Sequence, residues 1–143
     1  MTVADIIKYE GNEMILFVDD DPGVRGMGVL VLRTLGYTVL HCDDGREALL
    51  IAEHLTSQAP DLLVTSITLP GMDGRQLAGQ LQAKYPAMRV LYTPDDDDEI
   101  IELRSSPPDR LHLLQKPYIP SMLAAKVRRI LDASIDDPAA KEP

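Results

Sequence analysis

Acidic, hydroxyl and ammonium side chains follow apolar runs in this 143-residue chain, at the points where strands are expected to end. The residues in these positions are Asp19, Asp20, Ser66, Thr93 and Lys116. Adjacent carboxylates are ligands for a hard cation such as Mg²⁺, and an ammonium group pairs with an anion. A hydroxyl needs a neighbouring base before it attacks as a nucleophile, and no histidine accompanies Ser66 in its local motif. These residue types suit phosphate or metal chemistry if the fold brings them together.

The elements that would position them alternate between short apolar runs and segments of helical period, which is typical of parallel strands joined by crossover helices. The sequence predicts strands over residues 14–18, 37–41, 62–65, 89–92 and 111–115. It predicts helices over residues 22–35, 46–56, 74–85 and 119–133, and a short or irregular fourth helix within 95–108. The fold class is therefore α/β, with helices on both faces of a five-stranded parallel sheet. Open sheets of this kind bind ligands at the carboxyl ends of their strands, where all these polar residues fall.

Composition narrows the classes of function. The net charge of -9 disfavours direct nucleic-acid binding, because the phosphate backbone would be repelled. A single cysteine, Cys42, allows no internal disulfide and no zinc motif, which favours a reducing compartment, the cytoplasm. No apolar run is long enough to cross a bilayer, so we expect no direct membrane contact, and attachment to a longer, membrane-bound protein stays open.

The sequence predicts one domain over residues 13–133. Residues 1–12 form an N-terminal extension, and residues 134–143 form a polar, acidic tail or linker. We expect both ends to be frayed or to serve as linkers. The Asp95 to Asp98 run is interpreted as a solvated helix start, because adjacent carboxylates in a polar segment usually face water.

Four sequence segments occur in the same order and at the same spacing as in a known family. They are ILFVDDDPGVR, LGYTVLHCDDGREAL, DLLVTSITLPGMDG and LLQKPY. In order and spacing the chain resembles the receiver domains of two-component response regulators, over about residues 13 to 133. GRQLAGQL and LLQKPY are similar to the receivers of hybrid histidine kinases. The resemblance implies a flavodoxin-like, doubly wound sheet with strand order 2-1-3-4-5.

The resemblance also implies site roles. Asp19 and Asp20 match the acidic pair that holds Mg²⁺ in this family, together with a third carboxylate that accepts a phosphoryl group. Ser66 stands where that aspartate is expected. Serine is neutral and a weak metal ligand, so we expect no phosphorylation by the family's route and weak or absent Mg²⁺ binding. Lys116 matches the lysine that contacts the phosphoryl group, and here we expect it to neutralise Asp19 and Asp20 directly.

The switch position of the family, a Thr or Ser after the fourth strand, aligns without a gap on Pro94, with Thr93 one place earlier. Proline supplies neither a hydroxyl nor a backbone N–H, so phosphate sensing would be lost there as well. Leu113 stands where many relatives carry an aromatic residue that changes rotamer. A rotamer switch is therefore not expected.

Together these features predict a degenerate receiver, or pseudo-receiver, that has no enzyme activity and acts by binding a protein. The partner would be a histidine kinase or another signalling domain, contacted through the fourth helix, fifth strand and final helix, and a homodimer is a further option. The first alternative is a working receiver that binds Mg²⁺ and uses Asp73, Asp20 or Ser66 as acceptor. The second alternative is a module that binds a nucleotide or small ligand, although no glycine-rich phosphate loop follows any strand.

Overall fold

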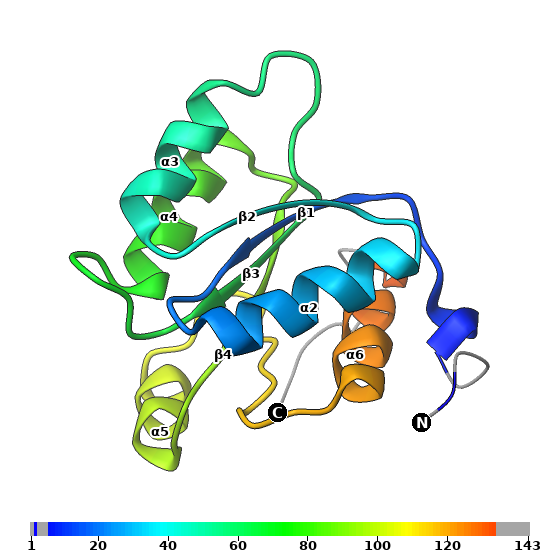
Figure 1. The fold of residues 1–143 in the computed structure, drawn as a ribbon. Helices are drawn as coiled ribbons and strands as arrows, with labels where there is room; N and C mark the ends of the chain where they lie inside the picture. The colour runs from blue at the N-terminus through cyan, green and yellow to red at the C-terminus, as the bar shows by residue number, and fades with distance from the viewer. Residues whose placement is uncertain (1, 3–5, 134–143) are drawn as a thin grey trace.

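The computed structural model describes residue 2 and residues 6–133 as three layers, a parallel sheet between two layers of helices (Figure 1). The sheet has the order β2-β1-β3-β4. Its strands are β1 (Met14–Val18), β2 (Thr38–Cys42), β3 (Leu62–Ser66) and β4 (Arg89–Thr93). The helices are η1 (Ile7–Tyr9), α2 (Pro22–Thr34), α3 (Gly45–Glu53), α4 (Gly74–Lys84), α5 (Asp97–Ser105) and α6 (Pro120–Asp132). The predicted α/β architecture is confirmed.

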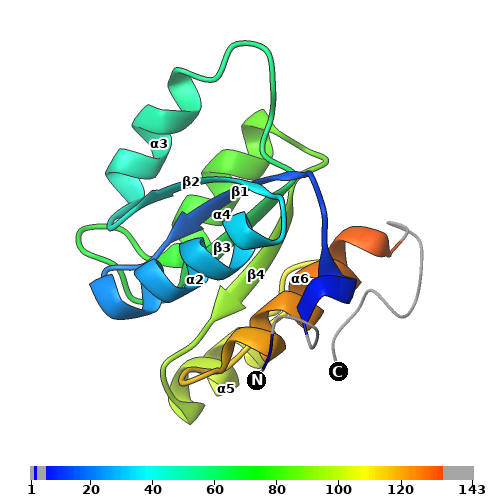
Figure 2. The ribbon, with the colours of Figure 1, turned by 45° about the vertical axis from the view of Figure 1, so that its right-hand side comes forward.

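The two inner strands, β1 and β3, are buried along their whole length, which explains why they read as continuous apolar runs. Alternate side chains of β1 enter different cores. Ile15 and Phe17 pack in the core beneath α2 and α6, whereas Leu16 and Val18 pack in the core beneath α3 and α4. Figures 1 and 2 show these helix pairs on opposite faces of the sheet. Each strand therefore belongs to both cores.

Aspartates begin four of the helices in the described part of the chain. Each N-cap carboxylate accepts a hydrogen bond from a backbone N–H of the first turn, and these residues are Asp21, Asp44, Asp73 and Asp96. Such caps satisfy the free N–H groups of a helix start and stabilise it by about 1 kcal/mol. These four aspartates, each of which follows a strand of the sheet, therefore have a structural role as helix caps.

The fifth strand is reduced. The predicted strand 111–115 forms only an isolated parallel bridge, between Tyr92 and Leu113. Three backbone bonds accompany it: Tyr92 N–H to the His112 carbonyl, Leu114 N–H to the Tyr92 carbonyl and Lys116 N–H to the Pro94 carbonyl. Two consecutive prolines at 107–108 have fixed φ angles and no N–H donors, so pairing does not extend toward that end. The fifth place of the predicted 2-1-3-4-5 order is held by an extended segment.

The fourth predicted helix is short, as expected: α5 has nine residues and ends before Pro107. The N-terminal extension differs from the expectation over residues 6–12, because Ile6 is buried in the core and η1 packs against α6. The prediction of a frayed extension is wrong for this part. The predicted tail, 134–143, lies outside the described residues. In the described part of the chain, no helix is both long and apolar enough to cross a bilayer.

Candidate functional site

The polar residues singled out in the sequence meet at the carboxyl edge of the sheet. Asp19 directly follows β1, Ser66 ends β3 and Thr93 ends β4. All three are at most 1% exposed, although their side chains are polar or charged. The strand register pairs Ser66 with Thr93. Buried polar groups need partners, so the contacts made here define the chemistry of the site.

Lys116 is the side chain that contacts Ser66 and both of the carboxylates Asp19 and Asp95. Its Nζ lies 3.0 Å from Ser66 Oγ, 3.3 Å from Asp19 Oδ2 and 3.0 Å from Asp95 Oδ1. The peptide bond from Lys116 to Pro117 is cis. One ammonium group thus joins the ends of β1 and β3 to the loop before α5.

Burial by itself would lower the pKa of Lys116. The hydrogen bond to Asp95 and the charge of Asp19 act in the opposite direction, and they prevail, so the pKa lies above its ordinary value. The ammonium group therefore stays protonated at neutral pH. It cannot accept the proton of Ser66.

Ser66 acts as a hydrogen-bond acceptor in this site. Its hydroxyl accepts a bond from the protonated Lys116, and its side chain has no exposed surface. A nucleophilic serine needs a base that takes its proton, and the hydrogen-bond partner recorded for Ser66 Oγ among the described residues, Lys116, is a donor. In this arrangement the recorded hydrogen-bond partner of Ser66 Oγ is a donor and not a base.

The two adjacent aspartates lie in different environments. Asp19 is buried, and its Oδ1 accepts a bond of 2.9 Å from the backbone N–H of Asp21. Asp20 is exposed and lines a depression of about 580 Å³ together with Asp95 and Lys116. The prediction that Lys116 neutralises Asp19 is confirmed. Its second recorded ion pair is with Asp95, and no ion pair with the expected partner Asp20 is found in the described part of the chain.

The site can be compared with what Mg²⁺ requires. Magnesium prefers six oxygen ligands in octahedral geometry, with one or two carboxylates supplying negative charge and water filling other positions. Ser66 brings no charge, and Lys116 Nζ lies within 3.3 Å of both Ser66 Oγ and Asp19 Oδ2. A cation between these oxygens would have to displace the ammonium group. The residues present do not fit the family's metal site.

Asp95 is a site residue that the sequence did not identify. Its side chain is 54% exposed, but one oxygen pairs with Lys116 and its backbone N–H bonds to Glu99 Oε1 at 2.6 Å. Glu99 Oε2 accepts a bond of 2.6 Å from the hydroxyl of Thr68 in the loop after β3. Within the Asp95 to Asp98 run no local feature distinguishes the first residue from the next three. Only the path of the loop after Pro94 brings it to Lys116.

The remaining candidate positions have structural contacts. Pro94 is buried, and its carbonyl accepts the N–H of Lys116 at 2.9 Å. Asp73 caps α4 through a bond of 2.8 Å from the N–H of Gln76. Leu113 forms the bridge to Tyr92 and packs at the margin of the core beneath α3 and α4. Asp73 is thus engaged in a cap and is not among the contacts of Lys116.

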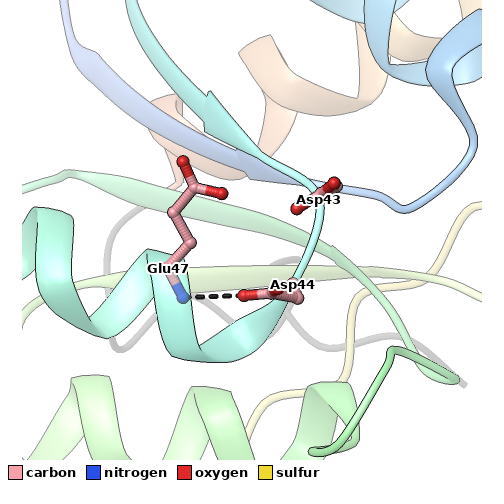
Figure 3. Close-up of side chains that lie close together, drawn as sticks. All are labelled: Asp43, Asp44 and Glu47. Carbon is pink, nitrogen blue, oxygen red and sulfur yellow. Dashed lines mark hydrogen bonds between the residues drawn. The ribbon is translucent and has the colours of Figure 1, made fainter.

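A second acidic cluster lies at the start of α3. In the described part of the chain, Asp43, Asp44 and Glu47 are the only three His, Cys, Asp or Glu side chains with ligand atoms within 4.8 Å of one another. Figure 3 shows the Asp44 carboxylate directed to the backbone N–H of Glu47, a bond of 2.7 Å. Helix capping accounts for this geometry, and Asp19 and Asp20 belong to no such group.

Comparison with known proteins places the chain among signalling modules. The family model described as "Response regulator receiver domain" matches residues 15–128. The DNA-binding response regulator MtrA of Mycolicibacterium smegmatis is 35% identical over 129 residues, covering 89% of this chain and 54% of that protein. The sensor kinase CckA of Brucella abortus is 32% identical over 131 residues, covering 91% of this chain and 14% of that protein. The chain therefore spans about half, or less, of these relatives.

Solved structures of receiver domains are also similar to this chain. The receiver domain of the hybrid histidine kinase CckA is 31% identical, with a TM-score of 0.68 and coverage of 83% of this chain and 99% of that one. A CheY-like receiver domain protein from Methanospirillum hungatei has a TM-score of 0.71 at 24% identity, covering 85% and 95% of the two chains. The second likeness supports the fold.

Proposed function

Since the chain belongs to the response regulator receiver domain family, we propose that it is a pseudo-receiver, a module of two-component signalling that is not phosphorylated at Ser66. It has no catalytic turnover of its own in this proposal. Its output is a protein interface with one stable arrangement of the strand ends. Buried, unpaired Cys42 suits the reducing environment of the cytoplasm, where we place it.

The contacts of Lys116 carry this proposal. In a working site of the family, a carboxylate at the position of Ser66 would compete for cations and accept the phosphoryl group. Here a protonated ammonium group lies against Ser66 and satisfies Asp19 and Asp95. The positive charge that a metal ion would place beside Asp19 is thus supplied by Lys116.

The proposed partner is a histidine kinase or another signalling domain. The surface formed by α5, residues 111–115 and α6 exposes three apolar side chains, Ile101, Ile119 and Met122. Exposed apolar side chains on an otherwise polar surface favour contact with another protein over contact with water. Residues 111–115 pair weakly with β4, so this surface differs from that of a complete five-stranded receiver.

Incubation with acetyl phosphate and Mg²⁺, followed by intact mass spectrometry, tests the proposal directly. We expect no mass increase of one phosphoryl group in the native chain. Beryllofluoride with Mg²⁺ should likewise leave the backbone amide signals of residues 66, 93 and 116 in place. Stable phosphorylation mapped to Ser66, Asp20 or Asp73 would refute the pseudo-receiver and support the working alternative.

The Ser66→Asp variant is the positive control. It restores a carboxylate beside Asp19, and we expect it to bind Mg²⁺ and gain the phosphoryl mass under the same conditions. Ser66→Ala is the matched negative control. Equal phosphorylation of the native chain and Ser66→Asp would show that the residue at this position does not decide the outcome.

A further inference from the structure

A cavity lies at the opposite end of β4 from Lys116. It has a volume of about 210 Å³ and lies between the end of α4, the first half of β4 and residues 108–112. Met88, Val90 and Tyr92 line it from one side and Arg110 from another. The reduced fifth strand opens this space, because pairing with β4 begins only at Tyr92.

Backbone groups of β4 face this cavity. Consecutive residues of a strand direct their N–H and C=O groups to opposite neighbours. Arg89 bonds toward β3, through its N–H to the Asp61 carbonyl, and Tyr92 bonds toward the reduced strand. Val90 therefore directs its N–H and C=O to the side of the reduced strand, where no backbone partner for it is found among the described residues. Val90 is only 6% exposed, so these groups gain little from bulk water.

Arg110 adds an unpartnered donor. Its Nη1 is buried and has no hydrogen-bond partner among the described residues. Arg89 also lines the cavity, but its guanidinium donates to the Ile130 carbonyl of α6. The charged groups left in the lining are Arg110 and one carboxylate, that of Asp109. A buried donor left unpaired is costly, and a charged acceptor relieves that cost best.

We propose that this cavity binds a small organic carboxylate. The carboxylate oxygens accept bonds from Arg110 Nη1 and the Val90 N–H. The apolar body of the ligand packs on Met88 and the ring of Tyr92, which a bare phosphate ion would leave uncovered. Liquid water occupies about 30 Å³ per molecule, so the volume suits a ligand of a few heavy atoms.

Titration of the native chain with sodium butyrate, followed by backbone amide shifts, tests this site. We expect saturable shifts centred on Val90 and residues 108–112. Butyramide, which has the same shape without the charge, and inorganic phosphate should shift these signals at least tenfold more weakly. Arg110→Gln should weaken butyrate binding by about tenfold or more, since it removes a charged hydrogen bond. Arg104→Gln removes an exposed arginine outside the cavity and should bind as the native chain does.

Acetate and benzoate extend the titration to smaller and larger carboxylates. Absence of saturable shifts with all three acids would overturn the proposal, and the cavity would then hold only water. Equal shifts with butyrate and butyramide would also overturn it, because the carboxylate would not be recognised. Arg110→Lys keeps the charge, so it should retain part of the affinity and guards against a folding defect in Arg110→Gln. None of these outcomes depends on the state of Ser66.

Discussion

Lys116 has one buried and one exposed carboxylate as ion-pair partners, and the two pairs differ in what they contribute. Asp19 is removed from water, with a side chain 1% exposed, whereas Asp95 is 54% exposed. Exposed ion pairs are screened and contribute about 1 kcal/mol or less. A buried carboxylate that loses its partner is strongly destabilising. The two carboxylates therefore allow matched substitutions around one ammonium group.

Lys116→Met should lower the free energy of unfolding by about 3 kcal/mol, because it leaves Asp19 buried and unpaired. Asp95→Asn should lower it by about 1 kcal/mol or less. Urea unfolding followed by circular dichroism measures both. Adding Asp19→Asn to Lys116→Met should recover part of the loss. Equal losses in Lys116→Met and Asp95→Asn would contradict this account of the site.

At this scale the sequence predicts the residue types of the site better than their pairing. The placement of Asp19, Ser66 and Lys116 at one sheet edge follows from strand ends alone. The role of Asp95 does not, since four consecutive aspartates look alike until the loop path is known. The exposed position of Asp20 is likewise set by the turn into α2.

At the junction of β3 and α4, two backbone segments approach each other closely. Gly74 begins α4, and its N–H bonds to the Ile67 carbonyl at 2.7 Å. A Cβ at this position would lie 1.9 Å from the backbone oxygen of Ser66. The loop after Ser66 thus returns close to the strand end that it leaves, and a glycine is needed for the approach.

Gly74→Ala should destabilise the fold by about 1–3 kcal/mol, because backbone must move to admit the methyl group. Gly79→Ala is the matched control in the same helix. A Cβ there meets nothing within 4 Å, so helix propensity should stabilise by about 0.5–1 kcal/mol. Thermal unfolding of both variants checks the opposite signs. A stable Gly74→Ala variant would show that the loop relaxes freely.

A local apolar pattern predicts some strands of this sheet correctly and fails for the fifth. Strands β1 and β3 are predictable from their apolar runs, because strands of a parallel sheet that are buried on both faces read as short continuous apolar segments. The run Leu111 to Leu114 is similarly apolar, yet it forms only one bridge. Its pairing is decided by the preceding prolines and by the edge position, which a local pattern does not encode.

Across the whole molecule, an ion cluster joins segments distant in the sequence. We define the Arg128 cluster as Glu13, Tyr37, Arg128 and Asp132. Arg128 of α6 pairs with both Glu13 oxygens, at 3.0 and 2.6 Å, and donates to the Tyr37 hydroxyl at 3.0 Å. Tyr37 in turn donates to the Tyr9 carbonyl. The chain before β1, the start of β2 and the final helix are thereby tied together.

This cluster predicts a specific dependence of stability on pH. The hydrogen bond from Arg128 lowers the pKa of Glu13 from 4.5 to about 2, against the opposing effect of burial. A folded-state pKa below the unfolded value means that the unfolded state binds protons first as the solution is acidified. The contribution of Glu13 is therefore complete above pH 4.5 and is lost as the pH falls toward about 2.

Glu13→Gln removes this titrating group with little change in shape, so the difference in Tm between native chain and variant should be largest near neutral pH. That difference should shrink from pH 4.5 downward and vanish near pH 2. Thermal scans at a series of pH values measure it. Asp132→Asn is the control, because Asp132 is 65% exposed and its pair with Arg128 contributes little. A Tm difference that stays constant from neutral to acid pH would mean that Glu13 stabilises through packing, since packing does not depend on its ionisation.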